Sequence, residues 1–253
     1  MTTSPDLLRL AIAVVILVGL ALAAATFGRL AARRQLAVAA GRAVLQLAVV
    51  SLIITAVLSH LVWSLIFALV MFGVAVGTSA RRIGAPRAWP WAAAAIASGV
   101  LPVLAVIFLS GTVPWNGPSL VPMAGIIIGG TMTAHSLLGR RLFGALRDDH
   151  GLYEAALSIG LPRPAAIAEV TGRHRIEALV PGLDQTRTVG LVTLPGAFVG
   201  VLLGGGTPLQ AGAAQLIVLI GLLAAQTICV VVGDRLIRAG LLLPKELRVA
   251  LVP

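Results

Sequence analysis

The chain has little of what a soluble domain carries. Charged residues make up 11% of its 253 residues and aromatic residues 4%, whereas hydrophobic residues reach 58%. Soluble domains average roughly 25% charged and 45–50% apolar residues. This composition excludes a soluble globular protein and indicates a membrane protein. The single cysteine, Cys229, excludes an intrachain disulfide framework and a cysteine-only metal cluster.

Lysine is nearly absent, since Lys245 is the only one among nineteen basic residues. The P-loop that hydrolyses ATP needs a Gly-Lys-Ser/Thr sequence to hold the phosphates, and Lys245 instead follows Pro244. We therefore expect no ATPase site, no other enzymatic activity and no bound cofactor in this chain. Any ATP that drives it would be hydrolysed by a partner subunit.

Seven apolar runs have about the length that a helix needs to cross a bilayer, roughly 20 residues. The second and third are short and nearly adjacent, but together they are almost twice as long as one crossing, so they predict two helices. A signal peptide is the alternative for the first run, although its start is not basic and it is longer than a typical signal core. The predicted spans are Leu7–Phe27, Ala43–Leu58, Val62–Thr78, Trp91–Leu109, Leu120–Leu138, Thr188–Leu203 and Gln210–Val232.

Basic residues fall at every second boundary between these runs. They follow spans one, three, five and seven, while the boundaries at 59–61, 110–119 and 204–209 have none, and only Arg9 falls on the other side. Membrane proteins concentrate positive charge in cytoplasmic loops. The pattern therefore predicts an outside N-terminus and a cytoplasmic C-terminus. It also explains the net charge of +10 without nucleic acid as a partner.

Small residues recur at a spacing of four in two of the predicted spans. Such stripes let helix backbones approach closely, so we expect them to pack helices within the chain, with a subunit interface or a substrate path as the alternatives. Pro195 lacks a backbone donor and should kink or break the sixth span, which is tolerated where neighbours or a cavity satisfy the freed carbonyl. The stripes comprise Gly125 and Gly129 in span five and Gly196, Gly200 and Gly204 in span six.

No Asp or Glu lies within a predicted span, which argues against a proton-coupled transporter, where such carboxylates form relays. The milder polar residues of the spans are candidates for a translocation pathway, with interhelical hydrogen bonding as the alternative. A metal-ligand role for the lone histidine of span five has no obvious partner residue. Two neighbouring residues without such polar groups, Met132 and Pro195, are included in the set. The pathway candidates are Arg42, Gln46, Met132, His135, Thr193, Pro195 and Gln215.

The longest polar stretch lies between spans five and six. Residues 152–159 favour a short helix, which Gly160, Pro162 and Pro164 then end, and a second helix is predicted over residues 165–178. A catalytic alternative would use Asp148, Asp149, His150 and Glu154 as a metal or acid–base cluster. No residue of the outer loops completes such a site, so we assign no catalytic residue.

The sequence Glu154-Ala155-Ala156, with Gly160 four residues after the second alanine, resembles the EAA motif of ATP-binding cassette (ABC) transporter permeases. In those proteins the motif forms a coupling helix that sits in a cleft of the cytoplasmic ATPase. The resemblance implies that the alanines give a flat packing face, that Glu154 makes one directional contact and that Gly160 permits a sharp exit. The Leu179-Val180-Pro181 sequence lies further downstream than the corresponding importer motif.

Over nearly its whole length the chain resembles one smaller family, the FetB-type permeases, which are known as iron exporters. Gly200, Gly205, Pro208, Ala211 and Gln215 extend the resemblance. Gly130, Thr133, Ala197, Phe198 and Val201 replace Asn and Met residues that are usual in the family. The matching groups are Gly41-Arg42 with Leu45-Gln46-Leu47, Ile127-Ile128-Gly129 with Met132, Glu154-Ala155-Ala156-Leu157 with Gly160, and Gly190-Leu191-Val192 with Leu194-Pro195-Gly196.

The spans predict an all-α polytopic membrane protein with seven transmembrane helices. Residues 1–253 would form a single permease domain, and residues 140–187 a cytoplasmic coupling loop within it. The resemblance implies a permease in the cytoplasmic membrane, formed by two copies of the chain and driven by ATP on a separate ABC ATPase. Its cargo would be iron, another metal ion or a small solute, with no metal site assigned. A self-sufficient secondary transporter or channel is the alternative.

Overall fold

The computed structural model describes residues 4–251, and the side chains from Leu7 onward. Within this range the regular elements are helices, apart from one isolated bridge between Val189 and Thr193. The helices fall into two compact units, Met1–Val57 and Leu58–Pro253. These are called unit 1 and unit 2 below, and each is described by itself.

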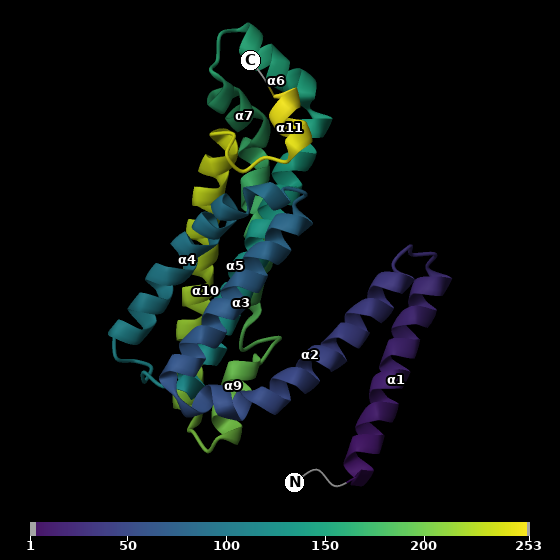
Figure 1. Cartoon of the computed structure of the whole chain (residues 1–253), viewed down its shortest axis with the longest axis vertical. Coiled ribbons are helices and arrows are strands. Elements are labelled where there is room, and N and C mark those ends of the chain that lie inside the picture. The colour runs from purple at the N-terminus through teal and green to yellow at the C-terminus, as the bar shows by residue number, and fades with distance from the viewer. Residues whose placement is uncertain (1–3, 252–253) are drawn as a thin grey trace. The chain divides into compact units, whose positions relative to one another are not determined.

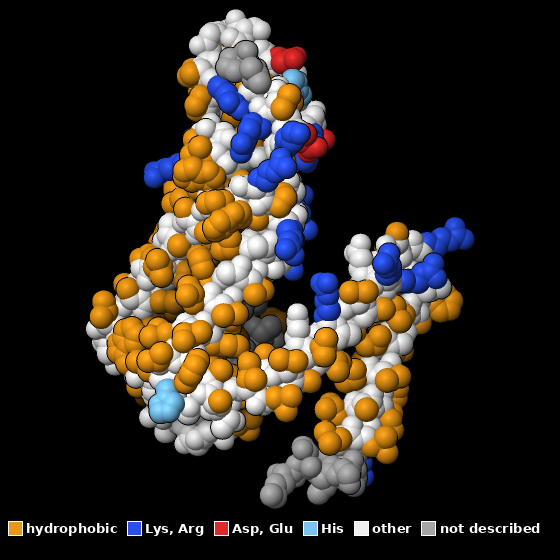
Figure 2. All heavy atoms as spheres, viewed as in Figure 1, with side chains coloured by type: hydrophobic (Ala, Val, Ile, Leu, Met, Phe, Trp, Pro, Cys, Tyr) orange, Lys and Arg blue, Asp and Glu red, His pale blue; other side chains and the backbone are white. Residues whose placement is uncertain are grey.

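Unit 1 is a hairpin of two long helices, α1 (Ser4–Phe27) and α2 (Arg33–Ser59), the last residues of α2 belonging to unit 2. The connecting turn contains Arg29 with a φ of 51°, and the amide of Leu30 donates to the carbonyl of Ala25 at 2.9 Å. α2 has no buried residue, so its apolar side chains face outward, as in a helix that contacts lipid. Basic side chains gather at the turn (Figure 2).

Unit 2 is built on four long helices, α3 (Leu61–Arg82), α4 (Trp89–Leu109), α5 (Gly117–Asp148) and α10 (Pro208–Arg238) (Figure 1). A short helix, η1 (Pro86–Ala88), leads into α4. α3, α5 and α10 run in one direction and α4 runs back. The four helices enclose a core of small and branched apolar residues with no exposed surface, among them Ala92, Ile96, Ala124, Ile127 and Ala225.

Glycines set the closest crossings between these helices. A Cβ on Gly99 of α4 would lie 2.2 Å from the carbonyl oxygen of Ala225 in α10, and one on Gly139 of α5 would lie 2.6 Å from Ile83. A Cβ on Gly130 would meet Leu222 of α10 at 2.3 Å. The side-chain-free faces therefore determine how closely α4, α5 and α10 pack, as in other membrane helix bundles.

Short helices cover one end of unit 2. α6 (His150–Ser158) and α7 (Arg163–Thr171) follow α5, η2 (Gly172–Ala178) leads on from α7, and α11 (Lys245–Ala250) follows α10. We call this the α6–α7 end, and the opposite end, where α9 lies, the α9 end (Figure 1). On the visible face, the basic side chains of unit 2 gather toward the α6–α7 end and hydrophobic side chains cover the rest (Figure 2).

The chain returns from the α6–α7 end to the α9 end through a discontinuous segment, residues 180–203, which we call the return segment. It consists of α8 (Val180–Thr188), an irregular stretch that includes the Val189–Thr193 bridge, and α9 (Gly196–Leu203). Of the predicted span Thr188–Leu203, only Gly196–Leu203 forms a helix of more than one residue, so this segment is not one of the long helices. The predicted break at Pro195 is confirmed, because α9 begins directly after this residue.

Six helices of the described chain are long and apolar enough to cross a membrane. They correspond to six of the seven predicted spans, and the sixth predicted span is represented only by the eight-residue α9. α5 has 32 residues and α10 has 31, so at 1.5 Å per residue each is about 46–48 Å long and extends beyond a 30 Å hydrocarbon core. The protein is therefore an all-α, multi-pass membrane protein.

The different surroundings of Gly99 and Gly129 predict opposite effects on stability for Gly→Ala substitutions at the two positions. In Gly99→Ala the new methyl group meets the Ala225 carbonyl, so we expect destabilisation by about 1–3 kcal/mol. At Gly129 of α5 a Cβ meets nothing within 4 Å, so Gly129→Ala should stabilise the helix by about 0.5–1 kcal/mol. Thermal denaturation of the purified chain in detergent measures both, and equal shifts for the two variants would contradict the close crossing.

Candidate functional site

A large cavity of unit 2 lies between the return segment, α5 and α10, and we call it the central cavity. Its volume is about 920 Å³, within the range of clefts that hold a small organic ligand. Pro118, Pro122, Met123 and Ile126 of α5 form one wall. Ser119 of α5 also lines the cavity. The other walls contain residues of the α4–α5 loop, the return segment and α10, namely Thr112, Val113, Pro114, Gln185, Pro195, Gly196, Ala197, Gly200, Val201, Ala214, Gln215, Val218 and Leu222.

The break in the return segment lies alongside the middle of α10. Near the start of the segment, a Cβ on Gly182 would lie 2.1 Å from the side-chain oxygen of Gln226. Pro195 and Gln215 line the same cavity. Along α10, Gln215 and Gln226 stand about 10 Å and 27 Å from Pro208. The non-helical backbone between the levels of Gln215 and Gln226 therefore lies beside α10, which is one of the candidate membrane spans.

The N-terminus of α9 opens onto the central cavity. Gly196 and Gly200 both lie in the wall, and a Cβ on either would meet no atom within 4 Å. The amides of Gly196 and Ala197 belong to the first turn, where amides have no partner inside their own helix. The absence of side chains at these two glycines thus leaves backbone groups accessible from the cavity.

Gln215 is the most deeply buried polar side chain in the cavity wall. Its exposed fraction is 5%, and its side-chain oxygen is buried without a hydrogen-bond partner in the described chain. An unsatisfied buried amide costs free energy that a ligand or a water molecule can recover. Of the sequence-predicted pathway residues, the structure brings Gln215 and Pro195 together in one cavity.

The other pathway candidates lie elsewhere. His135 is buried in the helix core, where its Nδ1 lies 2.7 Å from the hydroxyl of Ser79, which also contacts Ser136. Met132 packs half-buried against the same core, and the carbonyl of Thr193 accepts from Gly190 at 2.9 Å within the irregular stretch. Arg42 and Gln46 are exposed on α2 of unit 1.

The predicted packing glycines have mostly open surroundings. A Cβ on Gly125 would make ordinary contact with Met71 of α3, whereas one on Gly129, Gly196 or Gly200 would meet nothing within 4 Å. A Cβ on Gly204 would meet only its own helix. Their role in packing helices, against other copies or elements, stays a prediction.

α6 carries the predicted coupling residues and has two distinct faces. Tyr153 and Ala156 are buried, while Glu154 and Ala155 are exposed. Leu152 and Ile159, exposed by 43% and 80%, line up with Ala155 at helical spacing and form an apolar stripe on the outer face. Gly160 ends the helix with a φ of 92°, a conformation that other residues rarely adopt.

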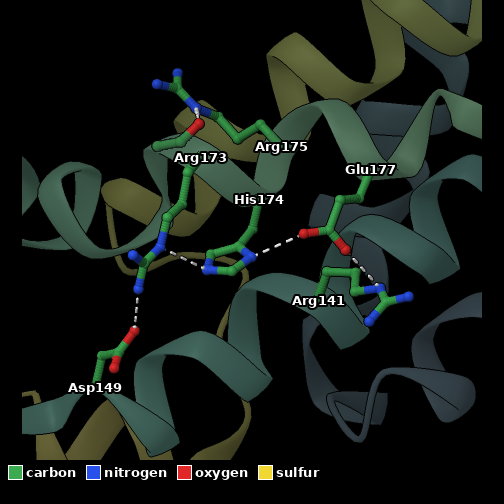
Figure 3. A network of polar contacts seen from close by, with 7 residues as sticks. Arg141, Asp149, Arg173, His174, Arg175 and Glu177 are labelled. Atoms are coloured by element: carbon green, nitrogen blue, oxygen red, sulfur yellow. Dashed lines mark hydrogen bonds and ion pairs between the residues drawn. The ribbon is translucent and has the colours of Figure 1, made fainter.

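A chain of polar contacts fixes η2 against α5 (Figure 3). Arg173 donates to Asp149 at 2.7 Å and to His174 Nε2 at 3.1 Å. His174 Nδ1 lies 2.8 Å from Glu177, whose second oxygen lies 2.9 Å from the Nε of Arg141. The two ring nitrogens of His174 thus contact Arg173 on one side and Glu177 on the other. The network holds the start of the return segment in place.

A second contact joins η2 to α10. Asp234 is 2% exposed and accepts from Arg175 at 3.1 Å and from Arg238. These residues line a smaller cavity of about 430 Å³ at the α6–α7 end. α11 is attached in a similar way, because Arg147 of α5 pairs with Glu246 and the Tyr153 hydroxyl donates to the carbonyl of Leu251. Burial raises the pKa of Tyr153, and nearby Arg163 partly opposes the shift.

The catalytic alternative gains no support from this arrangement. Asp149 is paired with Arg173, and His150 lies 3.5 Å from the exposed Glu154 on the surface of α6. Within residues 4–251 no group of three or more His, Cys, Asp or Glu side chains is placed to hold a metal ion. Asp149, Glu177 and Asp234 instead act as partners of arginines.

Sequence reasoning missed several residues of the site. Gln185 lines the central cavity together with Thr112, Ser119 and Met123. The sequence had placed Gln185 in the long polar loop, because charged residues flank it. Asp234 lies two residues beyond the predicted seventh span, and its pairing with Arg175 joins residues 59 positions apart. The capping box of Thr207 and Gln210, together with Pro208 at the first helical position, is the sequence signal that marks where α10 begins beside the cavity.

The buried and exposed ion pairs predict different sensitivities. Asp234→Asn removes the charge that faces Arg175 and Arg238 in a buried site, so we expect a loss of about 2 kcal/mol. Glu246→Gln breaks a pair whose side chains are 48% and 64% exposed, so we expect about 0.5 kcal/mol or less. Thermal denaturation in detergent would compare them. A loss for Asp234→Asn no larger than that for Glu246→Gln would show that the buried cluster does not hold η2.

Comparison with known proteins identifies one family. Residues 7–240 match the family described as "Uncharacterised protein family (UPF0014)". The rice protein named UPF0014 membrane protein STAR2 is 30% identical over 222 residues, which cover 86% of this chain and 77% of the relative. A Synechocystis protein named UPF0014 membrane protein slr1647 is 31% identical over 84% of this chain and 85% of its own length.

A more distant relative carries a functional name. The Escherichia coli protein named "Probable iron export permease protein FetB" is 28% identical over 208 residues, which cover 81% of this chain and 80% of the relative. No solved structure matches the chain.

Proposed function

This chain belongs to the UPF0014 family of membrane proteins, and we propose that it is the permease subunit of an ABC transporter. Two copies of the chain would form the translocation path, and two copies of a separate ATPase would supply the energy. The observation that carries the proposal is the central cavity, which is lined by α5 and α10, two candidate membrane spans, and by the interrupted return segment, which we place in the bilayer as a further crossing. Discontinuous crossings beside a solute site are a recurring feature of transporters.

The name of the Escherichia coli relative supports a permease role. The cargo class is then iron, another metal ion or a small solute, moved out of the cell. The sorting of basic residues to the α6–α7 end (Figure 2) favours a cytoplasmic location for this end. The proposed protein lies in the cytoplasmic membrane, with seven crossings if the return segment is counted, an outside N-terminus and a cytoplasmic C-terminus.

The outer face of α6 is the proposed docking surface for the ATPase. Its apolar stripe, Leu152, Ala155 and Ile159, lies at the charged end of unit 2, and Glu154 beside it has a side chain that is 69% exposed. Exposed apolar residues next to one exposed carboxylate suit a protein partner better than water. Ala156 instead faces inward, where it supports the helix from below.

The second copy of the chain is proposed from the surface of the irregular stretch. Leu191, Val192 and Leu194 are exposed by 88%, 78% and 61%. Lipid alone would leave the non-helical backbone beside them without hydrogen-bond partners. A second copy placed against this stretch would shield it and close the translocation path.

Glu154→Arg tests the coupling role in the complete complex. The substitution reverses one exposed charge on α6, so it should leave the fold intact and lower the ATPase rate of the complex by about tenfold, a typical size for coupling between sites. Glu169→Arg, on the exposed side of α7, is the matched control and should leave the rate unchanged. Gly160 is a poorer test, because its φ of 92° makes any substitution strained.

An unchanged ATPase rate in Glu154→Arg would contradict the coupling role. The alternative, a self-sufficient secondary transporter or channel, makes a different prediction for proteoliposomes. It requires flux of the cargo through the chain alone, without ATPase or ATP. The ABC proposal requires that ferrous or ferric iron, or another cargo, moves only when both the ATPase and ATP are present.

A further inference from the structure

The chemistry of the central cavity indicates which cargo it can hold, an inference that rests on the proposed permease function. Among the described residues of its wall, the only side-chain oxygen, nitrogen or sulfur atoms belong to Thr112, Ser119, Met123, Gln185 and Gln215. None of these groups carries a charge. The rest of the wall is proline, glycine and aliphatic side chains.

This wall does not suit a bare metal ion. Hard cations need several oxygen ligands, with carboxylates among them, and transition-metal ions favour thiolate or imidazole groups. One thioether, two amides and two hydroxyl groups in an apolar cavity offer neither a carboxylate nor a thiolate or imidazole group. Moving an ion into such a space without compensating ligands is strongly unfavourable.

The same wall suits an uncharged molecule that has an apolar body and one polar edge. Gln215 is 95% buried without a partner for its side-chain oxygen, and rotation of its terminal amide presents either an acceptor or a donor. The free amides at the start of α9 add donors, and Gly196 and Gly200 leave room beside them. A volume of about 920 Å³ accommodates a small organic solute.

We infer that the central cavity binds a solute without net charge, which contacts Gln215 and the first turn of α9 through its polar edge. Two sources have this chemistry. One is a metal-free organic molecule, and the other is a metal ion enclosed in an uncharged organic chelate. Both present an apolar exterior with a few hydrogen-bonding groups, so the cavity itself does not distinguish them.

Thiol modification in the full chain, held in lipid nanodiscs, tests the inference. With Cys229→Ala as background, Gly200→Cys places a thiol in the cavity wall, where a side chain meets no neighbour within 4 Å. Ethyl methanethiosulfonate is the neutral reagent, and its trimethylammonium and sulfonate derivatives are the charged ones. Gly151→Cys, on the exposed surface of α6, gives the reference rate of each reagent in water.

We expect the rate ratio of neutral to charged reagent to be about tenfold higher at position 200 than at position 151, which corresponds to ~1.4 kcal/mol. Gly212→Cys on α10, outside the cavity wall and with equally open surroundings, controls for contact with lipid. The neutral reagent should modify Gly200→Cys about tenfold faster than Gly212→Cys, because only the cavity admits both reagent and water.

Protection experiments distinguish a metal-free organic solute from a neutral metal chelate. Maltol alone should slow the neutral reagent at position 200 if the cavity takes metal-free solutes, and tris(maltolato)iron(III) alone should do so if it takes neutral chelates. Charged reagents that react at position 200 as readily as at position 151, or protection by ferrous ion alone, would overturn the inference. Loss of ATPase coupling would leave these rates unchanged, so failure of the proposed function would be recognised separately.

Discussion

Hydrogen bonding of backbone groups inside the bilayer is the constraint on which the rest of the structure depends. Helices satisfy these groups internally, and six long helices of this chain do so. The return segment does not, because it is interrupted between α8 and α9. Its position beside the central cavity is a setting in which such a break is tolerated, so fold and candidate site follow from the same requirement.

The long helices supply a rigid frame for that break. Close crossings at Gly99, Gly130 and Gly139 fix α3, α4, α5 and α10 against one another. At the α6–α7 end, arginines hold η2 through Asp149, Glu177 and Asp234. The return segment is therefore anchored at the end where α6 exposes its apolar stripe. A movement of α6 imposed by a partner would reach the cavity through the short path of α7, η2 and α8.

The six long helices follow from the sequence, because length and hydropathy alone decide whether a segment suits a bilayer. Their ends do not all follow, since α2 begins ten residues before the predicted Ala43 and α5 continues ten residues beyond the predicted Leu138. The break in the return segment was also predicted, from Pro195. The cavity could not be predicted in the same way, because Gln185, Met123 and Gln215 come from three elements that only tertiary packing brings together. Glycine spacing was ambiguous for a related reason: Gly99 and Gly200 look alike in sequence, yet one contacts a backbone carbonyl and the other faces open space.

The central claim is that the return segment crosses the membrane as a broken helix beside a water-accessible cavity. Hydrogen–deuterium exchange of the full chain in lipid nanodiscs tests it most directly. The account predicts that the amides of residues 194 and 196–198, which begin α9, exchange about a hundredfold faster than those of residues 218–230 in α10. Equal protection of the two regions would indicate a continuous, lipid-facing helix and would contradict the account.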